Sequence, residues 1–384
     1  MRHYDVVVVG GRIAGASTAL LLARAGVRVV LVEHGRRGSD TISTLALMRG
    51  GLLQLSRWGV LPEVVAANTP PVHEVVFHYA DGEDVSVPIR PSTGVDALYA
   101  PRRYLLDRLL VDAAASAGAE VLHQASATAL IRDGEDRVTG VQVRGPRGVP
   151  ISLHAPLTIG ADGVRSTVAA AVQAPVVWRG ANATGVLYRY FSDLPASGYE
   201  WAYGEGAAAG LIPTNDGTCV FVGATSGQVR SLRRNGAEQA FATLLAMAAP
   251  AFIDRVAEAK PATGLRGWGG IPGYLRRCWG NGWALVGDAG YFKDPITSHG
   301  MTDALRDAEL LANAVLAALS GCDEASALEA YERTRDLLSR DMFDATEAVA
   351  AYDWNLDKVR YLLREVSSAM GAEVDHLQSL QRDS

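Results

Sequence analysis

The stretch YDVVVVGGRIAGASTALLLARAGVRVVLVE, residues 4–33, decides the fold of this chain of 384 residues. Apolar, β-branched runs at 5–9 and 27–32 predict two strands, and residues 14–25, closed by Gly26, predict a helix between them. A helix that joins two parallel strands forms a βαβ unit. We therefore expect an α/β fold that begins with a parallel sheet.

The turn between the first strand and the helix reads GGRIAG, residues 10–15. A dinucleotide-binding fold places a tight turn and a helix N-terminus here, against a pyrophosphate. Gly10 suits the turn, Gly15 permits close helix–strand packing, and Glu33 can accept hydrogen bonds from a ribose hydroxyl. Arg12 replaces the middle glycine of the fingerprint and can add a phosphate contact. An ordinary strand-to-helix turn is the alternative for this motif alone. The predicted cofactor-binding residues here are Gly10, Arg12, Ile13, Ala14, Gly15 and Glu33.

The pattern changes several times before residue 160. Residues 45–58 and 102–117 have helical periodicity and are each followed by glycine. Between them, alternating residues at 72–79 and 85–89 flank Asp81-Gly82 and predict a β-hairpin. An apolar run at 157–159 predicts a further strand. The first domain therefore resumes after an excursion into a different sheet.

The second half is first aromatic and strand-like, then helical. Residues 175–270 predict a mostly antiparallel sheet interrupted by one long helix at 237–259. The glycine-rich segment 204–210 predicts a β-turn, because no helix with an acidic residue follows it. A strand is expected at 283–286 and helices at 301–380. The predicted domains are a discontinuous dinucleotide-binding domain (1–71, 101–174 and 276–320), a substrate-binding β domain (72–100 and 175–275) and a C-terminal helical region (321–384).

Composition excludes several classes of protein. The chain has 36 basic and 42 acidic residues, a net charge of −6 and no basic run, so nucleic-acid binding is not expected. Its three cysteines form no metal-binding pattern, and we expect no metal site. The N-terminus enters a strand directly, and no apolar run is long enough to cross a membrane. We expect a cytoplasmic monomer or homodimer.

Two further motifs extend the fingerprint. They are TIGADGVRS at 158–166 and ALVGDAG at 284–290, the second followed by DPITSHGM at 294–301. In this order and spacing they resemble the FAD-dependent class A monooxygenases of the para-hydroxybenzoate hydroxylase fold, over residues 4 to 350. The resemblance implies a Rossmann-like FAD-binding domain of the GR2 type, interwoven with a mostly antiparallel substrate domain and followed by C-terminal helices.

The resemblance also implies roles for single residues. Gly287 and Asp288 are expected to hold the flavin ribityl chain, and the loop that contains Pro295, Gly300 and Met301 is expected to stabilise negative charge on the reduced flavin. Further cofactor contacts are predicted at Asp162, Arg165, Arg49 and Arg102. For Asp162 and Arg165, the alternative is a structural Asp–Arg pair that caps a helix. For Arg49 the alternative is a solvated helix arginine, and for Arg102 the neighbouring Arg103 is a less favoured substitute.

The chemistry expected from the resemblance is oxygenation. NAD(P)H would reduce FAD, O₂ would add at flavin C4a, and the hydroperoxide would transfer oxygen to a small molecule, most simply an aromatic or polyketide-like compound of secondary metabolism. His299 and Tyr291 are the predicted proton-handling residues, with a structural role as the alternative for His299. Lys293 and Asp294 are expected to form a solvated pair. The predicted substrate-binding residues, for which an aromatic core layer is the alternative, are Tyr188, Tyr190, Trp201 and Tyr203.

The chain departs from its relatives at several positions. Tyr291 and His299 stand where histidine and glutamine or lysine are common, and Thr302 replaces a frequent asparagine. The segment GWGGIP, 267–272, carries glycine at both tryptophan positions of the halogenase pattern, which disfavours halogenation. Epoxidation and Baeyer–Villiger insertion remain open. The alternatives are a reductase or dehydrogenase of the same fold that acts on a C=C bond, and a flavoprotein that binds a ligand without turnover.

Overall fold

The protein is described by a computed structural model that covers residues 2–43, 45–92, 94–146 and 148–379. Its first layer is a six-stranded sheet in the order β18-β19-β10-β2-β3-β6, parallel except for β18. Every residue of β2 and β3 is buried, as expected for a parallel sheet covered on both faces. The strands are β2 (Val6–Val9), β3 (Val29–Glu33), β6 (Glu120–His123), β10 (Leu157–Gly160), β18 (Trp279–Gly280) and β19 (Trp283–Leu285).

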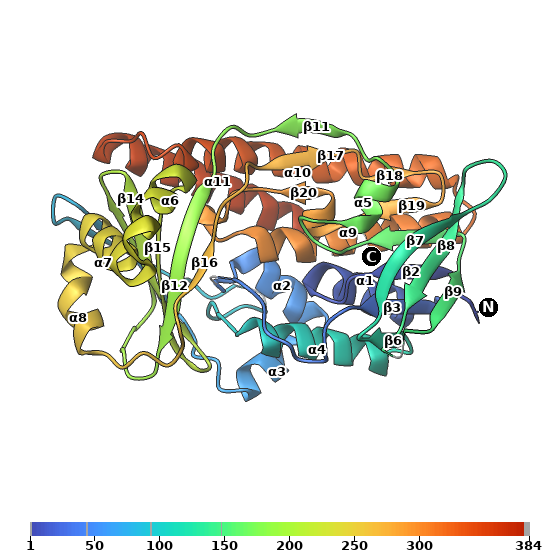
Figure 1. Ribbon diagram of the computed structural model, residues 1–384, viewed down its shortest axis with the longest axis horizontal. Helices are drawn as coiled ribbons and strands as arrows, with labels where there is room; N and C mark the ends of the chain where they lie inside the picture. The colour runs from blue at the N-terminus through green and yellow to red at the C-terminus, as the bar shows by residue number, and fades with distance from the viewer. Residues whose placement is uncertain (1, 44, 93, 147, 380–384) are drawn as a thin grey trace.

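Helices and a small sheet surround this layer (Figure 1). Helix α1 (Ile13–Arg24) packs against both α4 (Arg103–Ser116) and α9 (Gly300–Leu319). A second sheet of four strands is formed by segments that precede β10 in sequence. Its members are β1 (Arg2–His3), β7 (Ser126–Arg132), β8 (Val138–Arg144) and β9 (Pro150–His154), and the short helices nearby are α2 (Arg49–Arg57), α3 (Leu61–Ala66) and α5 (Thr167–Ala171).

The predicted β-rich part is a seven-stranded sheet, at the left of Figure 1, in the order β16-β12-β15-β14-β13-β4-β5. The predicted hairpin forms β4 and β5 and joins this sheet through a parallel pairing of β4 with β13. Its strands are β4 (Glu74–Tyr79), β5 (Asp84–Pro88), β12 (Thr184–Phe191), β13 (Tyr199–Gly204), β14 (Ala207–Thr214), β15 (Gly217–Thr225) and β16 (Arg266–Trp268). Helices α6 (Ser226–Leu232), α7 (Ala237–Ala248) and α8 (Ile253–Glu258) lie between β15 and β16 in sequence.

Two long helices connect the two parts. Helices α10 (Glu324–Ala350) and α11 (Leu356–Ser379) run along the top of Figure 1. Helix α10 packs on α9 and α11 packs on α2, while Trp354 between them donates a hydrogen bond to the carbonyl of Gly204 in the seven-stranded sheet. A three-stranded sheet is formed by β11 (Val176–Arg179), β17 (Tyr274–Arg276) and β20 (Tyr291–Phe292), in the order β11-β17-β20.

The mixed α/β architecture is confirmed, but three local predictions were wrong or incomplete. The helix predicted at 45–58 begins only at Arg49, because Leu45 has a φ of 76° and Leu47 pairs with Tyr99. The helix predicted at 237–259 stops after Ala248, where Pro250 starts a 3₁₀ turn (η2, Pro250–Phe252). The predicted turn at 204–210 is limited to residues 205 and 206, because Gly204 ends β13 and residues 207–210 belong to β14.

The remaining 3₁₀ turns are η1 (Arg233–Asn235), η3 (Gly287–Ala289) and η4 (Pro295–Thr297). The predicted division into three domains stays our proposal. Within the described ranges, no helix has the length and apolar character that crossing a membrane requires.

Candidate functional site

The motifs of the sequence meet at one edge of the six-stranded sheet. Pairing in register places Val9, Val32, Gly160 and Leu285 side by side at the carboxyl ends of β2, β3, β10 and β19. Four features lie at this edge: the glycine turn (residues 10–15), Glu33, the ADG loop (161–163) and the GDA loop (287–289). Ligands of open α/β sheets bind at this edge, so the geometry makes it the candidate functional site.

The glycine turn has no room for side chains. Gly10 has a φ of 106°, and a Cβ there would lie 2.3 Å from the carbonyl oxygen of Ala161. A Cβ on Gly15 would lie 1.8 Å from the carbonyl oxygen of Gly10. Ile13 and Ala14 form the first turn of α1, which has no side-chain cap among the described residues. The first amides of α1 are therefore available to an anion such as a pyrophosphate.

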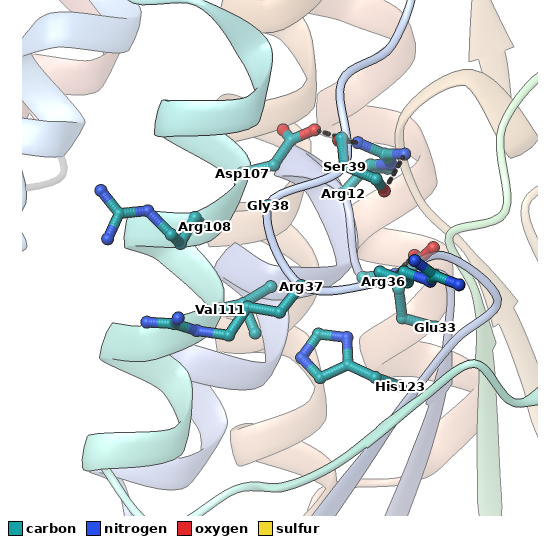
Figure 2. A pocket seen from close by; sticks show the side chains of 11 residues that line it. Arg12, Glu33, Arg36, Arg37, Gly38, Ser39, Asp107, Arg108, Val111 and His123 are labelled. Atoms are coloured by element: carbon teal, nitrogen blue, oxygen red, sulfur yellow. Dashed lines mark hydrogen bonds and ion pairs between the residues drawn. The ribbon is translucent and has the colours of Figure 1, made fainter. Parts of the chain in front are cut away.

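Glu33 closes the far side of the turn. Its buried carboxylate accepts hydrogen bonds from the amides of Gly11 (2.7 Å) and Gly35 (2.6 Å). Figure 2 shows the pocket that Glu33 lines together with the loop before Ser39 and with α4. A carboxylate fixed in this way at the end of β3 has the position and chemistry to bind a ribose hydroxyl.

Arg12 lies in the same pocket but is already paired. Its Nη1 donates to Asp107 of α4 (2.8 Å) and to the carbonyl of Ser39 (2.6 Å), as Figure 2 shows. Arg103 also donates to Asp107, at 3.1 and 3.2 Å. Arg103 is the less favoured of the two arginines that the sequence offered here, and Asp107 was not predicted, although the spacing of four between them on a helix was a usable signal.

Arg102 and Arg49 lie farther from the glycine turn. Arg102 donates to Asp40 (2.8 Å), and its guanidinium lies 3.7 Å from the ring centre of Tyr190 in the seven-stranded sheet. Arg49 donates to Ser92 and to the carbonyl of Arg90, both at 2.6 Å. The structure thus places Arg102 between the two parts of the protein, and places Arg103 beside the glycine turn.

Asp162 acts within its own segment. Its carboxylate accepts hydrogen bonds from Ser166 Oγ (2.5 Å) and from the amide and hydroxyl of Thr167 (2.6 and 2.7 Å), at the start of α5. Arg165 is exposed and forms no ion pair with Asp162. The helix-capping part of the structural alternative is therefore present, without the Asp–Arg pair.

The GDA loop approaches the glycine turn directly. Gly287 has a φ of 58°, and a Cβ there would lie 2.8 Å from the Cβ of Ala14 on α1. Asp288 follows and accepts no hydrogen bond on its carboxylate from any described residue. Burial raises the pKa of Asp288 to about 6, and the positive charge of Arg103 opposes this rise. A partly buried carboxylate without a donor fits a cofactor that supplies hydroxyl groups.

The segment that follows forms a rigid loop. Asp294 is buried, and its carboxylate accepts from the amides of Thr184 (2.6 Å) and Ile296 (3.0 Å), which joins the loop to β12. Pro295 opens a 3₁₀ turn, and Gly300 and Met301 begin α9, whose described N-terminal cap makes no side-chain hydrogen bond. Amides at this helix start are available to stabilise negative charge.

Beneath the loop lies a group of six buried ionisable side chains, which we call the α9 charge cluster. His299 Nε2 lies 2.6 Å from Glu373 of α11, and Arg306 donates to Glu373 (2.9 Å), Asp303 (3.2 Å) and Asp307 (2.7 Å). None of the six is more than 5% exposed. The α9 charge cluster comprises Lys293, His299, Asp303, Arg306, Asp307 and Glu373.

The α9 charge cluster corrects one prediction. Lys293 and Asp294 are not a solvated pair: both are buried, and Lys293 pairs with Asp303 instead. Burial lowers the pKa of Lys293 to about 7 and also lowers the pKa of His299. Burial alone would raise the pKa of Glu373, but its contacts with His299 and Arg306 outweigh this and lower it to about 2.

Three members of the cluster have the chemistry of metal ligands. One nitrogen or oxygen atom from each of His299, Asp303 and Glu373 lies within 4.8 Å of the others. Arg306, however, bonds both carboxylates, and Lys293 pairs with one of them. The two side-chain cations therefore supply the positive charge that a metal ion would bring.

Tyr291 lies deeper than the sequence suggested. Its ring packs 6.3 Å from Phe343, centre to centre, and its side chain is 2% exposed. The guanidinium of Arg306 lies 5.7 Å from the ring centre. The structure therefore brings both Tyr291 and His299 to the α9 charge cluster.

The four predicted substrate-binding aromatics share one face of the seven-stranded sheet. Tyr188 and Tyr190 meet edge to face at 6.0 Å, and all four side chains are at most 6% exposed. This face packs into the same core as the six-stranded sheet, whereas the opposite face packs against α7. Phe221 and Tyr199, which the sequence did not single out, belong to the same face. The four predicted residues are Tyr188, Tyr190, Trp201 and Tyr203.

Comparisons with known proteins agree with this geometry. A family model described as FAD binding domain matches residues 3–346. Digeranylgeranylglycerophospholipid reductase 2 of Methanothermobacter thermautotrophicus is 27% identical over 348 residues, 86% of this chain and 82% of that protein. The Pseudomonas aeruginosa protein PqsL, solved with 2-aminobenzoylacetate, has a TM-score of 0.79 at 24% identity and covers 94% of this chain and 100% of its own. Aklavinone-11 hydroxylase, solved with FAD and aklavinone, has a TM-score of 0.73 at 24% identity, over 91% and 69%.

Proposed function

Because this chain belongs to the FAD binding domain family and is an FAD-dependent oxidoreductase with the class A monooxygenase fold, we propose that it hydroxylates an aromatic or polyketide-like small molecule with NAD(P)H and O₂. The observation that carries the proposal is the aromatic face of the seven-stranded sheet. Its rings pack into the core shared with the six-stranded sheet, and aromatic rings of this kind stack on planar substrates.

Bound FAD supplies the electron transfer and the activation of O₂. The residues of this chain would hold it at the edge of the six-stranded sheet. Glu33 would accept from the ribose, the amides at the start of α1 would meet the pyrophosphate, and Asp288 would accept from the ribityl chain. The amides of Gly300 and Met301 would stabilise negative charge at the flavin ring.

His299 is our candidate for holding a proton beside the flavin loop, by which we mean residues 294–301, from Asp294 to the start of α9. Its Nε2 faces Glu373, whereas its buried Nδ1 has no partner among the described residues. A neutral imidazole that donates from Nε2 keeps a lone pair at Nδ1, which can accept a proton. The ring of Tyr291 packs against Phe343 and Arg306, and its buried hydroxyl has no hydrogen-bond partner among the described residues.

A reductase that acts on a C=C bond is the second candidate, because the archaeal relative bears the name of a reductase. Turnover under ¹⁸O₂ separates the two. We expect NAD(P)H loss that depends on an aromatic substrate, with one ¹⁸O atom in the product and no product without air. An unlabelled product that forms equally well under nitrogen would establish the reductase instead. Ligand binding without any cofactor consumption would mark a flavoprotein without turnover.

A further inference from the structure

A groove lined by three arginines lies beside the seven-stranded sheet. It has a volume of about 290 Å³ and lies between α6, the turn η1 and the loop after β16. All three arginines are exposed, and none forms an ion pair or a side-chain hydrogen bond with another described residue. The residues that line the groove are Ser226, Val229, Arg230, Arg233, Arg234 and Gly269.

Residues 230–234 contain three arginines without an ion-pair partner among the described residues, although the whole chain has a net charge of −6. Arg230 is three and four residues from Arg233 and Arg234, a spacing at which like charges on a helix repel each other. The negative end of the α6 dipole favours cations at this place, but it does not account for the groove that they line. Guanidinium groups that converge on an open groove are suited to a phosphate, which they bind through paired N–H donors.

The groove is connected to the flavin loop through consecutive contacts. Gly269 is followed by Gly270, whose Cβ position lies 2.6 Å from the carbonyl oxygen of Thr184. The amide of Thr184 donates to Asp294, the residue that caps the turn at Pro295. Trp268 also lies 6.5 Å from Phe292, ring centre to ring centre. These contacts join the backbone beside the groove to the segment that contains Asp294, while α6 itself packs on the face of the seven-stranded sheet opposite the aromatic face.

We propose that the groove formed by Arg230, Arg233 and Arg234 binds the phosphate group of a ligand of the flavin reaction. Two kinds of molecule carry this chemistry: the phosphorylated nucleotide that reduces the flavin, and an organic substrate that bears a phosphate. The link to the flavin reaction rests on the proposed function, whereas phosphate binding itself does not.

Binding of inorganic pyrophosphate to the FAD-loaded protein tests the site without turnover. Isothermal titration calorimetry should detect binding to the wild type, and R230Q/R233Q/R234Q should weaken it by about tenfold or more, since it removes three charge-assisted contacts. Gly269→Leu should weaken it too, because a Cβ at Gly269 meets nothing within 4 Å and a larger side chain would fill the groove. R144Q, which removes an exposed arginine at the end of β8, should bind like the wild type.

A second measurement identifies the source of the phosphate. If the triple variant raises KM for NADPH but not for NADH, the groove binds the 2′-phosphate of the nucleotide. If both values are unchanged while pyrophosphate binding is lost, the groove binds a phosphorylated substrate. Pyrophosphate that fails to bind the wild type, or binds all four proteins equally, would overturn the proposal. Failure of the ¹⁸O₂ experiment would leave this binding result intact.

Discussion

The two ends of the candidate cofactor site are built in different ways. At the glycine turn, Glu33 accepts an amide hydrogen only 22 residues away, so one βαβ unit completes this end. At the flavin loop, His299 depends on Glu373, which lies 74 residues farther along the chain on α11. The first end is a local structure that offers free amides, whereas the second is held by buried charges from distant elements.

This difference separates affinity from stability. A residue at the glycine-turn end can lose its cofactor contact while the sheet stays intact, because few of its groups support the core. A residue of the α9 charge cluster supports its neighbours, since removing one partner leaves another charge buried without compensation. We therefore expect mutations at the first end to change FAD binding and mutations at the second to change the free energy of unfolding.

The largest effect is expected from Arg306→Met. The variant leaves Asp303, Asp307 and Glu373 without their shared guanidinium, and the loss of one partner of a buried ionic network costs about 3–5 kcal/mol of unfolding free energy. Chemical denaturation of the protein measures this loss. Arg333→Met on the exposed face of α10 removes the same charge and should cost less than about 1 kcal/mol.

Glu373→Gln tests the same network with a change that preserves shape, in case Arg306→Met does not fold. It should destabilise less than Arg306→Met, because the amide still accepts a hydrogen bond from Arg306. Unfolding free energies equal to that of the wild type in both variants would show that the cluster does not hold the loop.

An intermediate effect is expected from Asp288→Asn, which lies between the two ends. Loss of the carboxylate should weaken FAD binding about tenfold, the cost of about one hydrogen bond to a charged group. Flavin fluorescence on titration of the apoprotein measures this affinity. Asp341→Asn, on an exposed part of α10, is the matched control and should leave FAD binding unchanged.

The same carboxyl group predicts a pH dependence. The pKa of Asp288 is raised from 3.8 to about 6 by burial, so the apoprotein holds a proton there between these values that the unfolded chain has lost. The contribution of Asp288 to stability therefore falls as pH rises through this window. Hydroxyl donors of FAD favour the carboxylate, so FAD affinity should rise with pH up to about 6. A wild type and an Asp288→Asn variant with identical pH profiles would contradict this assignment.

The comparison also explains which parts could be predicted from the sequence. Gly10 and Gly15 act through backbone geometry within a few residues, so a linear motif is sufficient to identify them. Glu373 lies in a helix whose pattern resembles that of any amphipathic helix, and nothing near it in sequence indicates a partner at His299. The arginine choice at the start of α4 was open for a related reason, because one residue of shift turns a helical side chain by about 100°.

That choice gives the smallest predicted effect. Arg103 pairs with Asp107 beside Arg12, and its charge opposes the rise that burial causes in the pKa of Asp288, whereas Arg102 points toward Asp40 and Tyr190. We expect Arg103→Gln to weaken FAD binding about three- to tenfold, the loss of one partly screened charge interaction of about 1 kcal/mol. Arg102→Gln should leave FAD affinity within about twofold and instead change KM for the substrate, because its ion pairs join the two parts of the protein. If Arg102→Gln weakens FAD binding more than Arg103→Gln does, the cofactor contact is Arg102, the arginine favoured by the sequence spacing. Arg103 would then not belong to the glycine-turn end of the cofactor site.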